Sequence, residues 1–166
     1  MTPDAAFWIE HLELIQHPEG GAFREIYRSR LTMAKQELPD EFSGERNVCT
    51  SIYFLLKQGE FSAFHRIASD EIWHFYVGSS LTIYEIQAAT GNLTKHTLGP
   101  DPLRGEMFQI MIRAGNWFGA RCEQGFVLAG CTVSPGFDFA EFELADRIKL
   151  IADYPEHKDL IVSLTR

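Results

Sequence analysis

The chain has 166 residues, of which 45% are hydrophobic, enough for one continuous core and little more. Its formal net charge of -8 disfavours contact with nucleic-acid phosphates and anionic membranes, so we expect neither as a partner. The sequence has no run of roughly 18 apolar residues and begins without a basic segment, which predicts a cytoplasmic location. Its three cysteines match no zinc-binding spacing and are expected to be reduced and buried.

The N-terminal third predicts a short helix, a strand and a loop. Asp4 is placed to cap a helix, because apolar residues follow it at spacings of three and four. The Gly20-Gly21 pair then breaks the chain before a strand of alternating character over residues 23–27. The polar, patternless run over residues 31–47 is expected to be an exposed loop.

The rest of the chain predicts a β-rich body closed by helices. From residue 48 to about 139, at least seven short β-rich runs are separated by glycine or proline turns, with no helical stretch between them. This pattern indicates an antiparallel sandwich or barrel and excludes a βαβ fold. Apolar residues at helical spacings around Pro155 then predict two closing helices over about 145–164. We therefore expect one domain, residues 1–166, with a barrel core over about 20–143.

One stretch, residues 59–78, carries most of the chemical signal. Gly59, His65, Glu71 and Gly78 fall in register with the first motif of the cupins, which this stretch resembles. Side chains alternate along the two strands of such a hairpin, so His65 and Glu71 are both expected to point into the barrel.

The resemblance to metal-binding cupins fails at two positions. In those proteins two further histidines complete a divalent metal site, whereas Ile67 and Phe118 stand at the corresponding positions here. No cofactor is therefore expected, with a weakly held divalent metal at His65 and Glu71 as the alternative. His74 would add a ligand only if a bulge turned it inward, since strict alternation places it on the opposite face of the sheet.

Runs along nearly the whole chain resemble one cupin family, known as DUF985 or cupin-5. They are HPEGGAFREIYRS, TSIYFLL, FHRIASDEIWHFYVG, IRAGNWFGA and GCTVSPGFDFAEFELA. The resemblance implies an all-β cupin fold, a double-stranded β-helix or jelly-roll barrel with short N- and C-terminal helices, assembled as a homodimer. It also implies similarity to the sugar-nucleotide epimerase-like cupins, in a family without a settled activity.

The candidate catalytic residues are His65, Glu71 and Tyr53. An imidazole and a carboxylate on neighbouring strands suit proton transfer, with His65 as base, Glu71 as its orienting group and Tyr53 as the opposing acid. Because a buried carboxylate is costly unless paired, Glu71 is expected beside His65 or an arginine.

Other polar or amphipathic residues are candidates for contacts with a ligand. The proposed ligand-binding residues are Arg24, Tyr27, Arg66, His74, Gln109 and Trp117. The resemblance implies that Arg24 and Tyr27 line the pocket mouth, whereas Tyr53, Gln109 and Trp117 are either core residues or part of a pocket wall. The alternative for Arg66 is an exposed ion pair with Asp70.

Two further segments are interpreted as structural. The residues His17, Pro18 and Glu19 precede the glycine break and favour a structural loop over a ligand contact. The aromatic residues of the segment after the last long strand are expected to pack the end of the barrel or a dimer partner; they are Phe137, Phe139 and Phe142.

These observations leave three functions open. The first is binding of a small polar molecule, such as a sugar phosphate or nucleotide sugar, with isomerase or epimerase activity an open question. A phosphorylated ligand would need cations near the mouth, for which the candidates are Arg24, Arg28, Arg66 and Arg113. The second is a non-catalytic binding or sensing module, and the third is a metal-dependent cupin enzyme with a degenerate ligand set.

Overall fold

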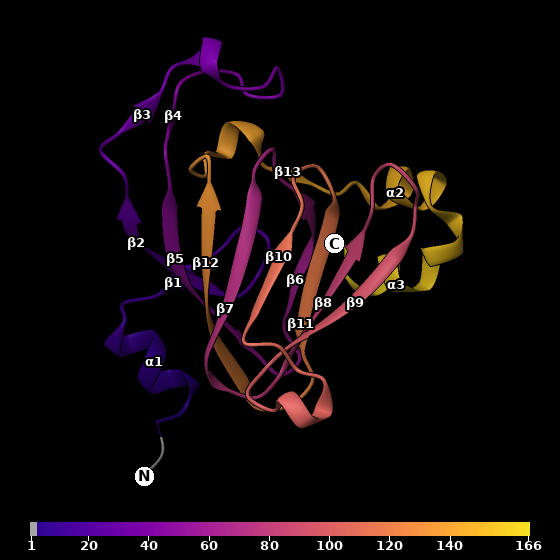
Figure 1. Cartoon of the computed structure of the whole chain (residues 1–166). Coiled ribbons are helices and arrows are strands. Elements are labelled where there is room, and N and C mark those ends of the chain that lie inside the picture. Colours follow the sequence, from indigo (N-terminus) through magenta and orange to yellow (C-terminus); the bar gives the residue numbers. More distant parts are fainter. Residues whose placement is uncertain (1–2) are drawn as a thin grey trace.

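The computed structural model describes residues 3–166 and consists mainly of two antiparallel β-sheets that face each other (Figure 1). The six-stranded sheet has the order β1-β2-β5-β12-β7-β10. Its strands are β1 (Ile15–Gln16), β2 (Ala22–Arg28), β5 (Thr50–Lys57), β12 (Phe126–Ser134), β7 (Asp70–Gly78) and β10 (Gln109–Ile112). The five-stranded sheet, in the order β13-β6-β11-β8-β9, consists of β13 (Glu143–Leu144), β6 (Phe61–Arg66), β11 (Trp117–Cys122), β8 (Leu81–Ile86) and β9 (Leu93–Leu98). This jelly-roll arrangement confirms the predicted all-β cupin fold.

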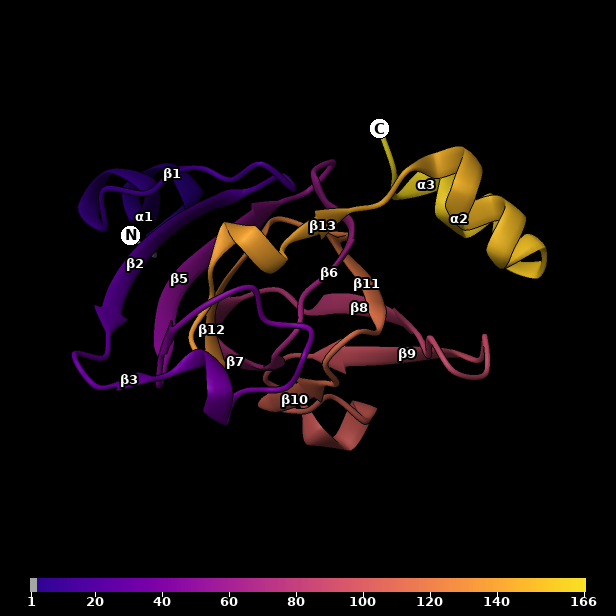
Figure 2. The ribbon, with the colours of Figure 1, turned by 90° about the horizontal axis from the view of Figure 1, so that it is seen from above.

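Short helices lie at both ends of the chain, as the sequence predicts. Helix α1 (Ala5–His11) is capped by Asp4, whose carboxylate accepts the Phe7 N–H at 2.9 Å. The closing helices are α2 (Arg147–Asp153) and α3 (Lys158–Ser163), and they flank the Pro155 break. Their apolar residues cover the outer face of the five-stranded sheet, whereas α1 packs near one end of the other sheet (Figure 2). None of the helices within residues 3–166 is long and apolar enough to cross a membrane.

The segment over residues 31–47 differs from the exposed loop expected for it. It contains a small two-stranded sheet, β3 (Thr32–Met33) and β4 (Arg46–Asn47). Leu38 and Phe42 are buried, and Arg46 forms a buried ion pair with Glu141. Glu141 lies about 95 residues after Arg46 in the sequence, so the local sequence pattern did not predict this contact.

The hydrophobic core fills one end of the space between the sheets. It is built from inward-facing residues of both sheets, among them Trp73 of β7, Leu56 of β5 and Ile83 of β8. Toward the other end, where β7 begins and β12 ends, the inward side chains include Glu71 and Cys131. The packed core thus gives way to a cavity with polar groups.

Candidate functional site

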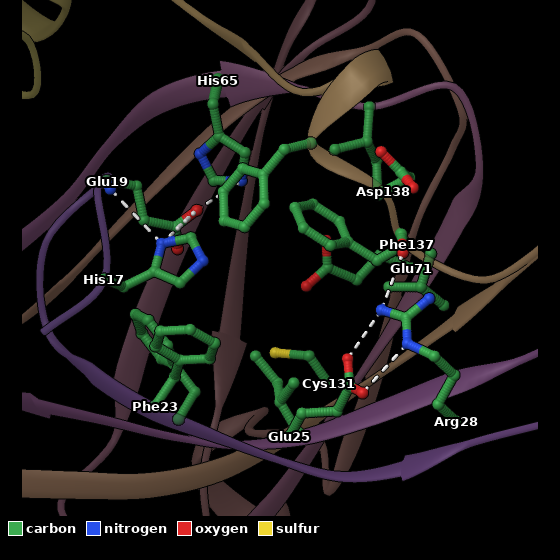
Figure 3. Close-up of a pocket in the computed structure, with 15 residues that line it drawn as sticks. His17, Glu19, Phe23, Glu25, Arg28, His65, Glu71, Cys131, Phe137 and Asp138 are labelled. Carbon is green, nitrogen blue, oxygen red and sulfur yellow. Dashed lines mark hydrogen bonds and ion pairs between the residues drawn. The ribbon is translucent and has the colours of Figure 1, made fainter. Parts of the chain in front are cut away.

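The cavity has a volume of about 200 Å³ and opens at the end of the barrel near the 3₁₀ helix η3 (Phe139–Glu141). Figure 3 shows acidic, aromatic and imidazole side chains around it. Its lining residues come from both sheets, from the turn before β2 and from the segment before η3. They are His17, Glu19, Phe23, Glu25, Arg28, Ile52, Phe54, His65, Ile67, Glu71, Cys131, Val133, Phe137, Asp138 and Phe139.

Strand alternation places most of these side chains, and a bulge in β2 places one more. In β2, Glu25 pairs with Ile52 of β5, but the next paired residue is Tyr27, opposite Ser51. Ile26 is therefore the extra residue of a β-bulge, which inverts the alternation after Glu25. As a result Arg28 faces the cavity, while Tyr27 points away and is 53% exposed.

His65 lies 2% exposed at the cavity wall, with both ring nitrogens engaged. Nδ1 lies 2.7 Å from the Ala63 carbonyl oxygen, and Nε2 lies 3.1 Å from Oε2 of Glu19. A carbonyl oxygen only accepts, so Nδ1 carries its hydrogen and the contact with Glu19 requires one further proton between the two groups. Burial lowers the pKa of His65 and raises the pKa of Glu19, so both shifts favour the uncharged forms of the two groups.

Glu19 is held by two further contacts, one with β6 and one within its own turn. Ser62 Oγ donates to its Oε1 at 2.9 Å, and its backbone N–H donates to Nδ1 of His17 at 3.3 Å. An Nδ1 that accepts this bond is unprotonated, in keeping with a His17 pKa that burial lowers. The turn itself requires Gly20, since a Cβ there would lie 2.1 Å from the Phe61 carbonyl oxygen at a φ of +117°.

Glu71 enters the cavity from β7 and is 7% exposed. Burial raises its pKa to about 7, although nearby His65 lowers it; Glu19 raises it further, and a hydrogen bond with the Cys131 thiol lowers it. Of the two neighbours expected for Glu71, His65 is the one that acts on its pKa, whereas within residues 3–166 no arginine or lysine pairs with this carboxyl group. Burial also raises the pKa of Cys131, which keeps it a neutral thiol.

The donor groups at this site do not make a metal-ligand set. Ile67 lines the cavity, and the ring of Phe118 packs 4.1 Å from that of His65, between centroids. In the part of the chain that the structure describes, no three His, Cys, Asp or Glu side chains gather to hold a metal ion. His74 faces the other side of the sheet, where its Nε2 lies 3.1 Å from Thr132 Oγ1. The bulge between β7 and β12 falls after it, opposite Leu128 and Ala129, and does not turn it inward.

Several residues that we expected at the pocket lie elsewhere. Tyr53 follows the cavity-facing Ile52 and so points outward, with its ring 5.8 Å from that of Tyr76. Tyr53 instead lines an apolar groove on the outer face of the sheet, which is separate from the cavity. Gln109 is exposed on β10, and Trp117 packs beneath the closing helices. The structure therefore does not bring Tyr53 to His65 and Glu71.

The arginines proposed for the mouth are mostly engaged outside the cavity. Arg24 pairs with Glu13 at 2.6 Å, and Arg66 pairs with Glu143 at 2.6 Å. Asp70, the alternative partner of Arg66, instead binds Arg113 at 3.2 Å. Of the four candidate cations only Arg28 lines the cavity.

Part of the site was not predicted from the sequence. His17 and Glu19 were interpreted as a structural loop, yet they contact the cavity and His65. Polar residues directly before a glycine pair were the available signal, but nothing local showed that the turn folds against β6. Phe137 and Phe139 do pack the end of the barrel, as expected, and there they also line the cavity mouth.

Comparison with known proteins places this architecture among related chains. Residues 6–145 match the family model described as Cupin superfamily (DUF985). The chain is 45% identical to protein SO0799 from Shewanella oneidensis, whose X-ray structure aligns with a TM-score of 0.88 over 99% of both chains. A hypothetical protein from Leishmania major is 30% identical, with a TM-score of 0.89 over 98% of this chain and 99% of that one. An uncharacterized protein from Saccharomyces cerevisiae, YML079W, is 29% identical over 145 residues, which cover 80% of this chain and 71% of that protein.

Proposed function

Because the chain belongs to the DUF985 family of the cupin superfamily, we propose that it catalyses proton transfer on a small polar molecule, as an isomerase or epimerase does. Its barrel holds a buried carboxyl group and an imidazole at one cavity. The observation that carries the proposal is Glu71, 93% buried, facing the cavity and with a pKa raised by burial to about 7. A carboxyl group with a pKa near neutral pH can both accept and return a proton.

The contacts around the two groups favour Glu71 as the base. Both nitrogens of His65 are already engaged, by Ala63 and by Glu19. An imidazole in this position would lose a hydrogen bond in order to meet a substrate proton. Within the described residues 3–166, the carboxylate of Glu71 has only the weak Cys131 thiol as a hydrogen-bond partner, and it points toward the cavity (Figure 3). The contact between His65 and Glu19, which requires a proton between the two groups, then forms the acid side of the site.

The cavity limits the part of the substrate that is enclosed. Its volume of about 200 Å³ is below the roughly 300–1,000 Å³ of pockets for drug-sized ligands. A single sugar-sized unit with a carbonyl group and an acidic neighbouring C–H is the substrate class we propose, in line with the implied similarity to sugar-nucleotide epimerases. A nucleotide or phosphate attached to it would extend past the mouth, where Arg28 stands.

Hydrogen exchange at carbon tests the proposal without knowledge of the product. Neutral sugars, amino sugars, sugar phosphates and nucleotide sugars would be incubated with the protein in D₂O, and deuterium at carbon followed by NMR. We expect exchange with wild type, a loss of roughly a hundredfold or more in Glu71→Gln, and no loss in the matched control Glu123→Gln, at an exposed turn.

The outcomes separate the candidate functions. Exchange that survives in both Glu71→Gln and His65→Asn would show that the chemistry lies elsewhere. A ligand that binds in the cavity with no exchange at any carbon would instead assign the site to binding or sensing.

A further inference from the structure

Most of the titratable groups that line the cavity are acidic. Four carboxyl groups and one guanidinium group face it; the acidic residues are Glu19, Glu25, Glu71 and Asp138, and the basic residue is Arg28. The two imidazoles add little positive charge, because burial lowers the pKa of both His17 and His65. Burial raises the pKa of Glu19 and of Glu71, and Glu25 is paired with Arg28, so the negative charge that a ligand meets in this cavity comes from Asp138 and from the ionised form of Glu71.

Arg28 offers little of its charge to a ligand. Its Nε and Nη2 bind the two carboxylate oxygens of Glu25 at 3.0 and 2.7 Å. Nη1 donates to Asn47 at 2.8 Å, and Nη2 donates a second time to the Phe137 carbonyl oxygen at 3.1 Å. These four bonds use four of the five N–H groups of a guanidinium. Arg28 thus ties β2 to β4 and to the segment before η3, and its charge is neutralised by Glu25.

Glu71, by contrast, is paired with no arginine or lysine among the described residues 3–166. It is 7% exposed, and its hydrogen-bond partner in the described part of the chain is the Cys131 thiol, a weak donor. Buried carboxylates in proteins are otherwise paired with a cation or with strong donors. Its oxygens face the cavity (Figure 3), so a cavity ligand is the group placed to supply the missing partner.

The remaining walls are apolar, and four of their side chains are phenylalanines. Phe23 and Phe54 lie on one side, and Phe137 and Phe139 stand at the mouth with ring centroids 4.9 Å apart. Aromatic faces attract cations, and most strongly where water is excluded. Carboxylates and phenyl rings around one small cavity are a combination that recognises organic ammonium groups.

We propose that the cavity takes a small organic cation, whose ammonium group pairs with Glu71 and whose apolar part packs against the phenylalanine rings. This inference rests on the proposed function for the place of binding, and it adds the charge of the substrate. It remains compatible with Glu71 as base, because one carboxylate oxygen can accept the N–H group while the other faces the neighbouring C–H. A phosphate group enclosed in the cavity is disfavoured, since its charge would be repelled by Asp138 and by the ionised form of Glu71.

Two sets of isosteric probes test the sign of the charge. The first is choline, 3,3-dimethyl-1-butanol and 3,3-dimethylbutanoate; the second is benzylammonium, benzyl alcohol and benzoate. Binding would be measured by calorimetry with a chelator present throughout, and located by NMR shifts of cavity residues. We expect the ammonium member of at least one set to bind about tenfold or more tighter than its neutral partner, and the carboxylates not to bind.

Variants then assign that preference to residues. Glu71→Gln should abolish it, Glu123→Gln should leave it unchanged, and Asp138→Asn, which keeps the cap acceptor for the Ala140 N–H, should reduce it about threefold. If Glu71→Gln does not fold, the Asp138→Asn result decides.

Three results would overturn the inference: equal or tighter binding of an alcohol or carboxylate, a preference that Glu71→Gln retains, or no ammonium probe bound in the cavity. Carbon exchange on a neutral or anionic sugar with no ammonium binding would overturn the cation alone and leave the proposed function intact. Ammonium binding without hydrogen exchange at any carbon would contradict the proposed catalysis and leave the cation inference intact.

Discussion

The carboxyl group of Glu71 is kept from water without a cation beside it, and this ties its protonation to the stability of the fold. Burial raises its pKa from the ordinary 4.5 to about 7 in the folded protein. The folded state therefore holds a proton that the unfolded chain releases at a lower pH. Such a group favours the fold fully below the unfolded pKa, and the advantage is lost as the pH rises through the folded pKa.

Glu71→Gln should remove this pH dependence. Relative to the variant, wild type is expected to lose on the order of 3 kcal/mol of unfolding free energy between pH 4.5 and about 7. Urea unfolding of both proteins across that range measures the difference, with Glu123→Gln as control. A difference that stays constant with pH would mean that Glu71 ionises in the folded protein as readily as in the unfolded chain.

His65 should matter for stability as well as for chemistry. Asn cannot reach both Ala63 and Glu19, so His65→Asn leaves a buried carboxyl group without its partner, at a cost of about 1–3 kcal/mol. The double variant His65→Asn/Glu19→Gln should lose less unfolding free energy than the sum of the losses in the two single variants. The double-mutant cycle by urea unfolding gives the coupling energy, and additive effects would contradict a functional pair at the His65–Glu19 contact.

Of the four titratable residues His17, Glu19, His65 and Glu71, the sequence predicted two as site residues. His65 and Glu71 were predictable because a motif and strand alternation both place them inward. His17 and Glu19 were not, since their role depends on a turn that folds against β6, more than 40 residues later by the Glu19–Ser62 spacing. Tyr53 shows the converse error: an attractive residue type was assigned to the pocket, although the alternation in β5 directs it outward.

Among the secondary-structure elements, the ion pair of Arg46 and Glu141 fastens β4 to η3 beside the cavity mouth. Both side chains are under a tenth exposed, and Ser43 donates to the same carboxylate from its backbone N–H and its hydroxyl. The pair therefore holds the segment over residues 31–47 against the aromatic segment that lines the mouth.

Removing one partner of this pair should be costly. Glu141→Gln is expected to lower the unfolding free energy by on the order of 2–3 kcal/mol, because it leaves a buried guanidinium unpaired. The exposed pair of Arg121 and Glu123 provides the comparison, and Glu123→Gln should change stability by less than about 1 kcal/mol. Equal effects of the two substitutions in chemical denaturation would show that the Arg46 pair is solvated.

Strand existence was predictable from hydrophobic patterning, but strand irregularities were not. The β2 bulge at Ile26 decides that Arg28 enters the cavity and Tyr27 leaves it. A single extra residue in a strand changes no local propensity, so it has no signature in the sequence. The mouth of the pocket, unlike its floor, could therefore not be assigned by counting alternate residues.

For the whole molecule, the two sheets differ in how their outer faces are covered. Helices α2 and α3 cover the five-stranded sheet, whereas α1 covers only part of the six-stranded one (Figure 2). On the uncovered part, Ile72 of β7 and Met111 of β10 are paired neighbours, each 38% exposed, and Tyr76 is 46% exposed. Adjacent apolar side chains of this kind on a sheet face mark an interaction surface.

We predict that a second copy of the chain covers this face, which would meet the expectation of a homodimer that the family resemblance implies. Ile72→Glu would place two buried charges at a symmetric interface and should shift the protein to the monomer, because each copy contributes the same patch. Ile148→Glu is the matched control, since Ile148 is 80% exposed on α2, away from this sheet. Sedimentation equilibrium at micromolar concentration should give the mass of two chains for wild type and for Ile148→Glu, and of one chain for Ile72→Glu. A wild-type mass of a single chain would refute the dimer, and a dimer that survives Ile72→Glu would place its interface on another surface.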